Sequence, residues 1–182
     1  MNRKRGGGIS ARRARLRAAG LLLLLSPAWT CPALTRTDTT SVTVTIGAEA
    51  SISVSSPTSL TQAGGGFVAF LGSSTVTFSI RTTKVGGSGS ILLLAAEFTP
   101  AGGPTVASGN LTYTCGGAPA VGTLCSGTQT ASTSSSTPVI SSIGANQKVA
   151  NTTATVSWTL MDSPLYSTGA YSAVVTFTVT SL

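Results

Sequence analysis

The chain has 182 residues, a formal net charge of +7 and no histidine. Seven of its eleven basic residues fall within the first seventeen positions, and the four that remain after residue 33 are balanced by four acidic residues. The part after residue 33 is therefore neutral and almost uncharged. Such a surface argues against nucleic acid and anionic membranes as partners.

Residues 1–33 have the three parts of a secretory signal peptide. A basic region is followed by the apolar stretch 18–25 and then by small residues. This stretch is shorter than the roughly 20 residues that a membrane-spanning helix needs. Two cleavage sites are open, after Ala28 and after Ala33, and we favour the second. We expect a helical signal peptide over 1–33, then one domain over 34–182 that is secreted, periplasmic or held at the cell surface.

The three cysteines support the later cleavage site. Cleavage after Ala33 removes Cys31 and leaves Cys115 and Cys125, and a lone pair in an oxidising compartment indicates a disulfide. A redox pair would favour the tighter Cys-x-x-Cys spacing, so we predict a structural bond. Two alternatives for the leader stay open. Cys31 is the lipid-carrying residue in one, and Arg12-Arg13 belongs to a twin-arginine signal in the other.

The composition after residue 33 indicates an all-β protein. Serine and threonine supply 53 of these 149 residues, whereas eight are charged. Helix surfaces are usually built from charged and long polar side chains, while threonine and valine suit a pleated strand. Seven alternating or continuously apolar segments separated by turn residues predict a single antiparallel β-sandwich of about seven strands with an immunoglobulin-like layout.

The predicted strands follow one another in chain order. The first covers 39–46, with Val42, Val44 and Ile46 on one face, and after Gly47 it resumes over 50–55. The later strands are expected at 75–81, 90–98, 111–115, 139–143, 153–160 and 169–182. We expect 90–98 to be buried on both faces and 139–143 to be a short edge strand.

The last predicted strand shows the clearest alternation. We expect 170–181 in the middle of a sheet, with Tyr171, Val175 and Phe177 facing the core. Glycine-rich loops are predicted at 64–66 and 86–89. The serine-rich run 132–136 has the composition of a flexible linker.

The residues that carry most enzyme chemistry are missing or scattered. The absence of histidine excludes Ser-His-Asp and Cys-His catalysis and most zinc and iron sites. Four acids follow residue 33, and we expect Glu49 and Glu97 within strands, Asp38 near a strand end and Asp162 in a turn. No two share a local motif of the kind that glycoside hydrolysis or calcium binding uses. We therefore predict a non-enzymatic protein with no catalytic, cofactor-binding or metal-binding residue.

The aromatic residues leave a carbohydrate-binding module open as an alternative. Such modules stack sugar rings on exposed aromatic side chains. Trp158 lies in an alternating segment and is predicted to be a core residue. Tyr166 lies in a turn-rich segment and is the better exposed candidate, although a packed corner tyrosine is favoured. Asn110 and Asn151 match the N-glycosylation pattern, which chance also produces in a threonine-rich chain.

The C-terminal segment carries a family resemblance. Residues 167–180, with Gly169, Tyr171 and then the alternating Val175, Phe177 and Val179, resemble the last strand of secreted bacterial fimbrial subunits and spore-coat-U-type proteins. This resemblance implies an immunoglobulin-like subunit and, for some members, assembly by donor-strand exchange. Two features depart from it. The cysteine pair lies late in the chain, and the last residue is Leu182 rather than an aromatic residue.

Three function classes follow. The favoured one is an exported structural or surface protein, a fimbrial or coat-like subunit that contacts itself or another surface protein through a sheet edge. The donor would be the alternating segment 39–46. The second class is a secreted carbohydrate- or ligand-binding module, and a hydrolase is the least favoured.

Overall fold

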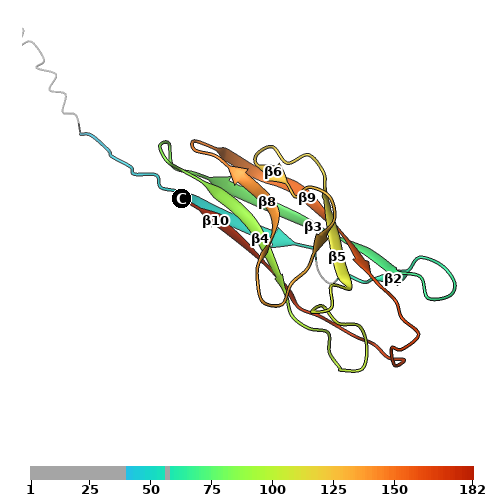
Figure 1. Ribbon diagram of the computed structural model, residues 1–182. Coiled ribbons are helices and arrows are strands. Elements are labelled where there is room, and N and C mark those ends of the chain that lie inside the picture. The colour runs from blue at the N-terminus through green and yellow to red at the C-terminus, as the bar shows by residue number, and fades with distance from the viewer. Residues whose placement is uncertain (1–39, 56–57) are drawn as a thin grey trace, which may run out of the picture. The chain divides into compact units, whose positions relative to one another are not determined.

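The computed structural model describes residues 40–55 and 58–182. The predicted signal peptide, Cys31 and Asp38 lie outside these ranges. The chain divides into two units at Val42, and all the strands lie in the second unit, Thr43–Leu182 (Figure 1). The described residues form strands, turns and loops but no helix, so they contain no helix of the length and apolarity needed to cross a membrane.

The second unit contains ten strands. They are β1 (Glu49–Val54), β2 (Thr61–Gln62), β3 (Phe70–Arg81), β4 (Gly89–Ala95), β5 (Leu111–Gly116), β6 (Thr123–Leu124), β7 (Gln129–Thr130), β8 (Thr137–Ile143), β9 (Lys148–Leu160) and β10 (Val175–Ser181). Strands β2, β6 and β7 are two residues long, which leaves seven strands of six residues or more. The predicted all-β sandwich is confirmed.

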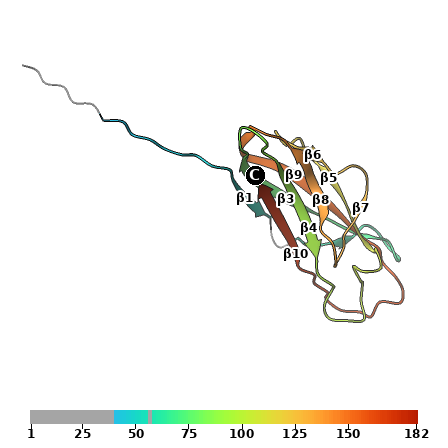
Figure 2. The same ribbon diagram turned by 60° about the vertical axis from the view of Figure 1, so that its left-hand side comes forward.

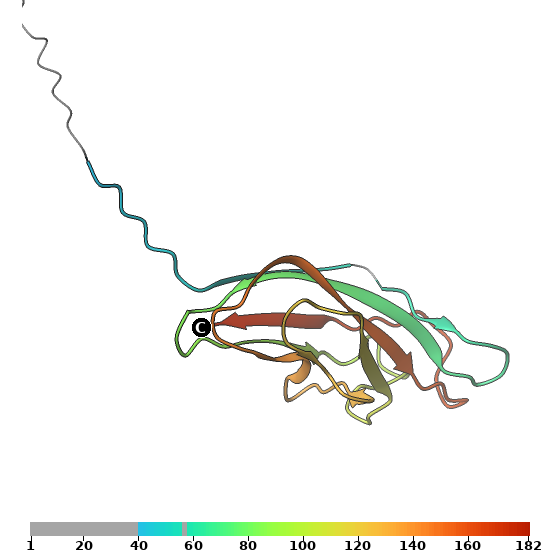
Figure 3. The same ribbon diagram turned by 90° about the horizontal axis from the view of Figure 1, so that it is seen from above.

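The strands form two antiparallel sheets that pack face to face (Figure 3). One sheet has the order β1-β3-β9-β5-β7, with β2 also paired to β3, and the other has the order β10-β4-β8-β6. Counted among the seven long strands, these orders are 1-2-6-4 and 7-3-5. An immunoglobulin constant domain has 1-2-5-4 and 7-6-3. The fifth and sixth long strands have therefore exchanged sheets, because β8 lies beside β4 and the next strand, β9, crosses to β3.

The core lies between the inward faces of both sheets. Strand β3 contributes Val76, Phe78 and Ile80, and β9 contributes Ala154, Val156, Trp158 and Leu160, all at most 6% exposed. The opposing sheet contributes Ile91, Leu93, Val139, Ile140 and Ile143. The buried residues of β3 and β9 occupy alternate positions of 75–81 and 153–160, so the predicted inward faces of those two strands are confirmed. Burying each such side chain contributes about 1.5–3 kcal/mol relative to leaving it in water.

Two aromatic residues in the core keep their polar atoms satisfied. The Trp158 Nε1–H donates a 2.9 Å hydrogen bond to Ser74 Oγ, and the Trp158 ring lies 5.5 Å from the ring of Tyr113. The Tyr113 hydroxyl lies 2.9 Å from both Thr137 Oγ1 and the Pro138 carbonyl oxygen. Burial raises the pKa of Tyr113, against a smaller lowering by Thr137. The prediction that Trp158 is a core residue is confirmed.

The predicted strand 39–46 is wrong where it can be compared. Residues 40–48 form no strand, and Thr39 lies outside the described residues. The first strand begins at Glu49, which pairs with Arg81. The backbone N–H and C=O groups of a strand need hydrogen-bond partners. Strand β3 offers no free residue to 40–48, because its last residue, Arg81, already pairs with Glu49. The alternation is present without the pairing.

The predicted strand 90–98 is too long. Strand β4 ends at Ala95, so Glu97 lies in the following loop rather than in a strand. The strand buries Ile91, Leu93 and Ala95, while Leu94 is 36% exposed. One face of β4 therefore packs in the core, and the continuous apolar run does not reflect burial on both faces.

The final strand has the predicted faces but not the predicted place. Strand β10 begins at Val175 and pairs only with β4, so it is an edge strand. Tyr171 lies in the preceding loop, where its ring packs against Gly103 and its hydroxyl donates to the Ser167 carbonyl oxygen at 2.6 Å. Alternation in the sequence indicates which side chains face the core. It does not indicate whether a strand has one neighbouring strand or two.

Two other predictions also change. Strand β8 pairs with β4 on one side and with the short β6 on the other, so it is not an outermost strand. The run 132–136 is a short loop between β7 and β8 rather than a linker. Its Ser132 Oγ accepts hydrogen bonds from the amides of Ser134 and Ser135, each at 3.2 Å. Because the preceding Ala131 is buried in the core, the segment is held in place.

Candidate functional site

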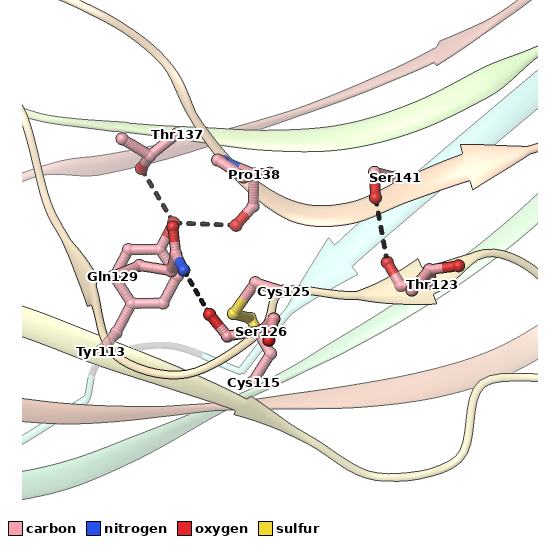
Figure 4. Close-up of a disulfide and its surroundings, with 9 residues drawn as sticks. All are labelled: Tyr113, Cys115, Thr123, Cys125, Ser126, Gln129, Thr137, Pro138 and Ser141. Atoms are coloured by element: carbon pink, nitrogen blue, oxygen red, sulfur yellow. Dashed lines mark hydrogen bonds between the residues drawn. A yellow bond between two sulfur atoms is a disulfide. The ribbon is translucent and has the colours of Figure 1, made fainter.

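One edge of the sandwich is closed by a disulfide. Cys115 in β5 of one sheet is bonded to Cys125, which directly follows β6 of the other sheet (Figure 4). The predicted Cys115–Cys125 bond is confirmed. The Cys125 amide also donates to the Val139 carbonyl oxygen in β8 at 3.0 Å. The outermost strands here, β6 and β7, are two residues long, and such short strands give an incoming chain little to pair with.

The opposite edge of the sandwich is open. Strands β1 and β10 are the outermost long strands of their sheets, and they lie near each other without pairing (Figure 2). Strand β1 pairs only with β3, and β10 pairs only with β4. Each strand therefore presents one side of its backbone with no strand beside it in the described part of the chain. A long unpaired edge is a template for adding another strand.

The hydrogen-bond register shows which backbone groups of β10 face outward. The Ala96 amide donates to the Val174 carbonyl oxygen at 2.8 Å, and Leu182 and Ser88 exchange two such bonds. In an antiparallel ladder such bonded pairs recur at every second residue. The even-numbered residues of β10 therefore bond to β4. The N–H and C=O groups of Val175, Phe177 and Val179 point to the open side.

The same three residues expose part of their apolar side chains. Val175, Phe177 and Val179 pack against the core but are only half-buried, as are Ile52 and Val54 of neighbouring β1. The intervening threonines of β10 are exposed. The open edge thus combines free backbone groups with apolar side chains that a further strand would cover.

The N-terminal segment has the pattern of such a strand. Val42, Val44 and Ile46 are 92%, 77% and 65% exposed, and they alternate with Thr43 and Thr45. The segment 40–48 has nine residues, which span about 30 Å when extended, whereas the seven residues of β10 span about 23 Å. It is long enough to match β10 along its whole length.

Of the four acidic residues singled out by sequence analysis, the three within the described ranges, Glu49, Glu97 and Asp162, have structural partners. Glu49 Oε2 accepts a 2.9 Å bond from Arg81 Nη2, in an exposed ion pair. Asp162 accepts bonds from the Ser163 amide at 2.8 Å and from Gln62 Nε2 at 3.0 Å, as expected of a turn residue. The described residues contain no group of three or more side chains of the kinds that bind metals.

Glu97 holds a loop in place. Its two carboxylate oxygens accept hydrogen bonds from the amides of Val106 and Ala107, each at 2.7 Å. The Val106 amide is the main reason that the pKa of Glu97 lies below its usual value; the Ala107 and Phe98 amides add to this lowering and partial desolvation opposes it. The carboxylate therefore serves the loop 97–107 and contacts neither Glu49 nor Asp162.

The aromatic residues do not form a sugar-binding platform in the described ranges. Trp158 is buried, and Tyr166 is half-buried with its hydroxyl 3.2 Å from Asn110 Nδ2, as the packed-corner interpretation expects. Phe67, in the loop between β2 and β3, is 68% exposed and is the single large exposed aromatic residue in the described ranges. Sequence analysis missed it, because one phenylalanine beside three glycines carries no periodic signal.

An open hollow of about 490 Å³ lies between β1, β3 and β9, lined by the Glu49–Arg81 pair and Lys148 among others. It is a depression beside the bulge in the pairing of β3 with β9.

Comparisons with protein-family models, with curated proteins and with solved structures found no match for this chain.

Proposed function

We propose that this chain is an exported, non-enzymatic structural or surface protein whose copies assemble by strand addition. Residues 40–46 of one copy would pair with β10 of the next copy. The carrying observation is the open edge of β10, where the outward backbone groups and the half-buried apolar side chains belong to the same residues. The resemblance of 167–180 to fimbrial and coat-like subunits favours the same function.

Export is supported by the Cys115–Cys125 disulfide together with the signal-peptide pattern of 1–33. Disulfides persist in oxidising compartments and are rare in the cytosol. A ligand-binding module would be favoured by several exposed aromatic side chains on one face, and the described residues supply Phe67 alone. Strand addition has the stronger support.

Strand addition makes the two faces of the donor segment unequal. Val44 and Ile46 would enter the apolar edge of the neighbouring copy, while Thr43 and Thr45 would point to solvent. We expect Val44→Asp with Ile46→Asp to abolish assembly, because a buried unpaired carboxylate is strongly unfavourable. Thr43→Asp with Thr45→Asp adds the same charge to the same segment and should leave assembly intact. Size-exclusion chromatography with light scattering measures both.

The acceptor edge has its own test. Val179→Pro removes an outward N–H without removing a β10–β4 hydrogen bond, and proline is tolerated on the solvent side of an edge strand. We expect a folded protein that no longer accepts a donor strand yet still donates its own segment. The proposal would be overturned if the Val179→Pro protein and the protein with Val44→Asp and Ile46→Asp both still assemble.

A further inference from the structure

The charged side chains are segregated to opposite ends of the sandwich. The cationic side chains of the described residues are Arg81 at the end of β3, Lys84 in the β3–β4 turn and Lys148 at the start of β9, so all three lie at one end. Glu97 follows β4 and Asp162 follows β9, so both acids lie at the other end (Figure 1). We call these the basic end and the acidic end. Glu49 is the one described acid at the basic end, where it pairs with Arg81.

Both ends also expose apolar side chains beside the charges. At the basic end, Val85 is 86% exposed and Leu182 is 69% exposed, and both flank the turn that carries Lys84. At the acidic end, Phe67, Met161 and Leu165 are 68%, 57% and 89% exposed. Gln62 in β2, the strand before the Phe67 loop, bonds to Asp162, which follows Met161. Exposed apolar side chains beside charges give each end groups that a second copy could cover.

The charges of the two ends are complementary, and the basic end is hollowed. The basic end has a hollow of about 240 Å³ lined by Ile46, Lys84, Asn146 and Lys148. The acidic end presents Asp162 on a turn fixed by Gln62 and the Ser163 amide. Two basic ends or two acidic ends would place like charges together, whereas a basic end facing an acidic end would pair them.

We propose that the basic end of one copy of this chain docks onto the acidic end of the next copy. Lys84 and Lys148 would face Asp162, and Val85 and Leu182 would cover Phe67 and Leu165. A contact between two different surfaces of the same chain is heterologous and builds open rows rather than closed dimers. This contact uses no residue of β10 and, of the donor segment, only Ile46 in the lining of the hollow, so it goes beyond strand addition.

Cysteine cross-linking tests the polarity of the contact. Exposed pairs of this kind are individually weak, and a disulfide between copies traps a transient contact. One preparation carries Val85→Cys and another carries Leu165→Cys, both with Cys31→Ser. Both also carry Val42→Asp and Val44→Asp, which disable the apolar face of the donor segment without changing Ile46 in the hollow. After mixing and mild oxidation, we expect the mixed dimer, which joins one copy of each preparation, to exceed either homodimer several-fold on non-reducing gels.

Charge reversal tests the chemistry of the contact. Lys84→Glu with Lys148→Glu in the Val85→Cys protein should lower the mixed dimer several-fold, and Asp162→Lys in the partner should restore it. Thr176→Glu with Thr178→Glu adds negative charge to the outer face of β10, away from both ends, and should have no effect. Circular dichroism checks that each variant is folded.

Equal amounts of mixed dimer and homodimers would overturn the proposed polarity. Salt screens exposed charge pairs. If neither the charge reversals nor added salt changes the yield of mixed dimer, the contact does not depend on these charges and the proposed electrostatic attraction is wrong. Since donor residues 42 and 44 are disabled throughout, failure here leaves strand addition as it was. Failure of strand addition likewise leaves this contact standing.

Discussion

The indole N–H of Trp158 in β9 and the hydroxyl of Ser74 in β3 form a 2.9 Å hydrogen bond inside the sandwich. Both residues are buried, at 5% and 4% exposure. Ser74 therefore occupies an inward position of β3 that the pattern of the strand reserves for apolar side chains. Its hydroxyl satisfies the one polar atom that Trp158 brings into the core, and Thr58 Oγ1 lies 2.7 Å from the same hydroxyl.

Removing this hydroxyl should destabilise the fold. Ser74→Ala leaves the buried indole N–H without a partner, which costs about 1–3 kcal/mol. Ser73→Ala, at the exposed neighbouring position, should change the free energy of unfolding by less than about 0.5 kcal/mol. Urea unfolding followed by tryptophan fluorescence measures both variants. Equal small effects would show that the hydrogen bond contributes nothing to stability.

The edge position of β10 lowers the expected cost of truncating Phe177. Phe78 is 1% exposed, and Phe78→Ala should cost about 3–5 kcal/mol, the range for a fully buried phenylalanine. Phe177 is half-buried, so Phe177→Ala should cost clearly less, about 2 kcal/mol. Thr178→Ala, on the outer face, should cost less still. If Thr178→Ala destabilises as much as Phe177→Ala in urea, the assignment of the two faces is wrong.

The hydrogen bonds from loop amides to Glu97 make part of the stability depend on pH. The folded pKa of Glu97 is lowered, so its contribution is fully present above the pKa of the unfolded chain and is lost as pH falls through the folded value. Glu97→Gln should therefore destabilise the protein at pH 7, by about 1 kcal/mol for bonds this exposed. The difference from the parent should shrink under strongly acidic conditions.

Unfolding in urea at about pH 7 and at about pH 2–3, on either side of the ordinary carboxyl range, measures this difference. Glu49→Gln is the matched control, because its ion pair with Arg81 is exposed and such pairs contribute little. A Glu97→Gln effect that is the same at both pH values would contradict the proposed role of the carboxylate.

The disulfide should contribute measurably to stability. It closes a loop with a sequence separation of ten residues, for which the chain-entropy account gives about 2–3 kcal/mol. We expect Cys115→Ser with Cys125→Ser to lower the urea midpoint accordingly, and dithiothreitol to produce the same shift in the parent. Intact mass before and after reduction checks that the parent contains one bond. Two free thiols in the exported protein would contradict the pairing.

Composition and local patterns were enough to predict the class of fold and the inward faces of the main strands. Alternation at 75–81 and 153–160 reports which side chains meet the core, since successive side chains of a strand point to opposite faces. The cysteine positions predicted the Cys115–Cys125 bond, because the expected removal of Cys31 with the leader leaves two cysteines and therefore one pairing.

Which strands lie side by side depends on contacts between distant parts of the chain. Local alternation is the same in a central strand and an edge strand, so it predicts β10 inside a sheet and a paired strand at 39–46. The edge at Phe177 is open because β10 pairs with β4 alone and no described strand lies on its other side. Val44 and Ile46 are unpaired because β3 ends at Arg81, which pairs with Glu49. The separation of Lys148 from Asp162 to opposite ends follows from the direction of β9, along whose length no local pattern relates the two charges.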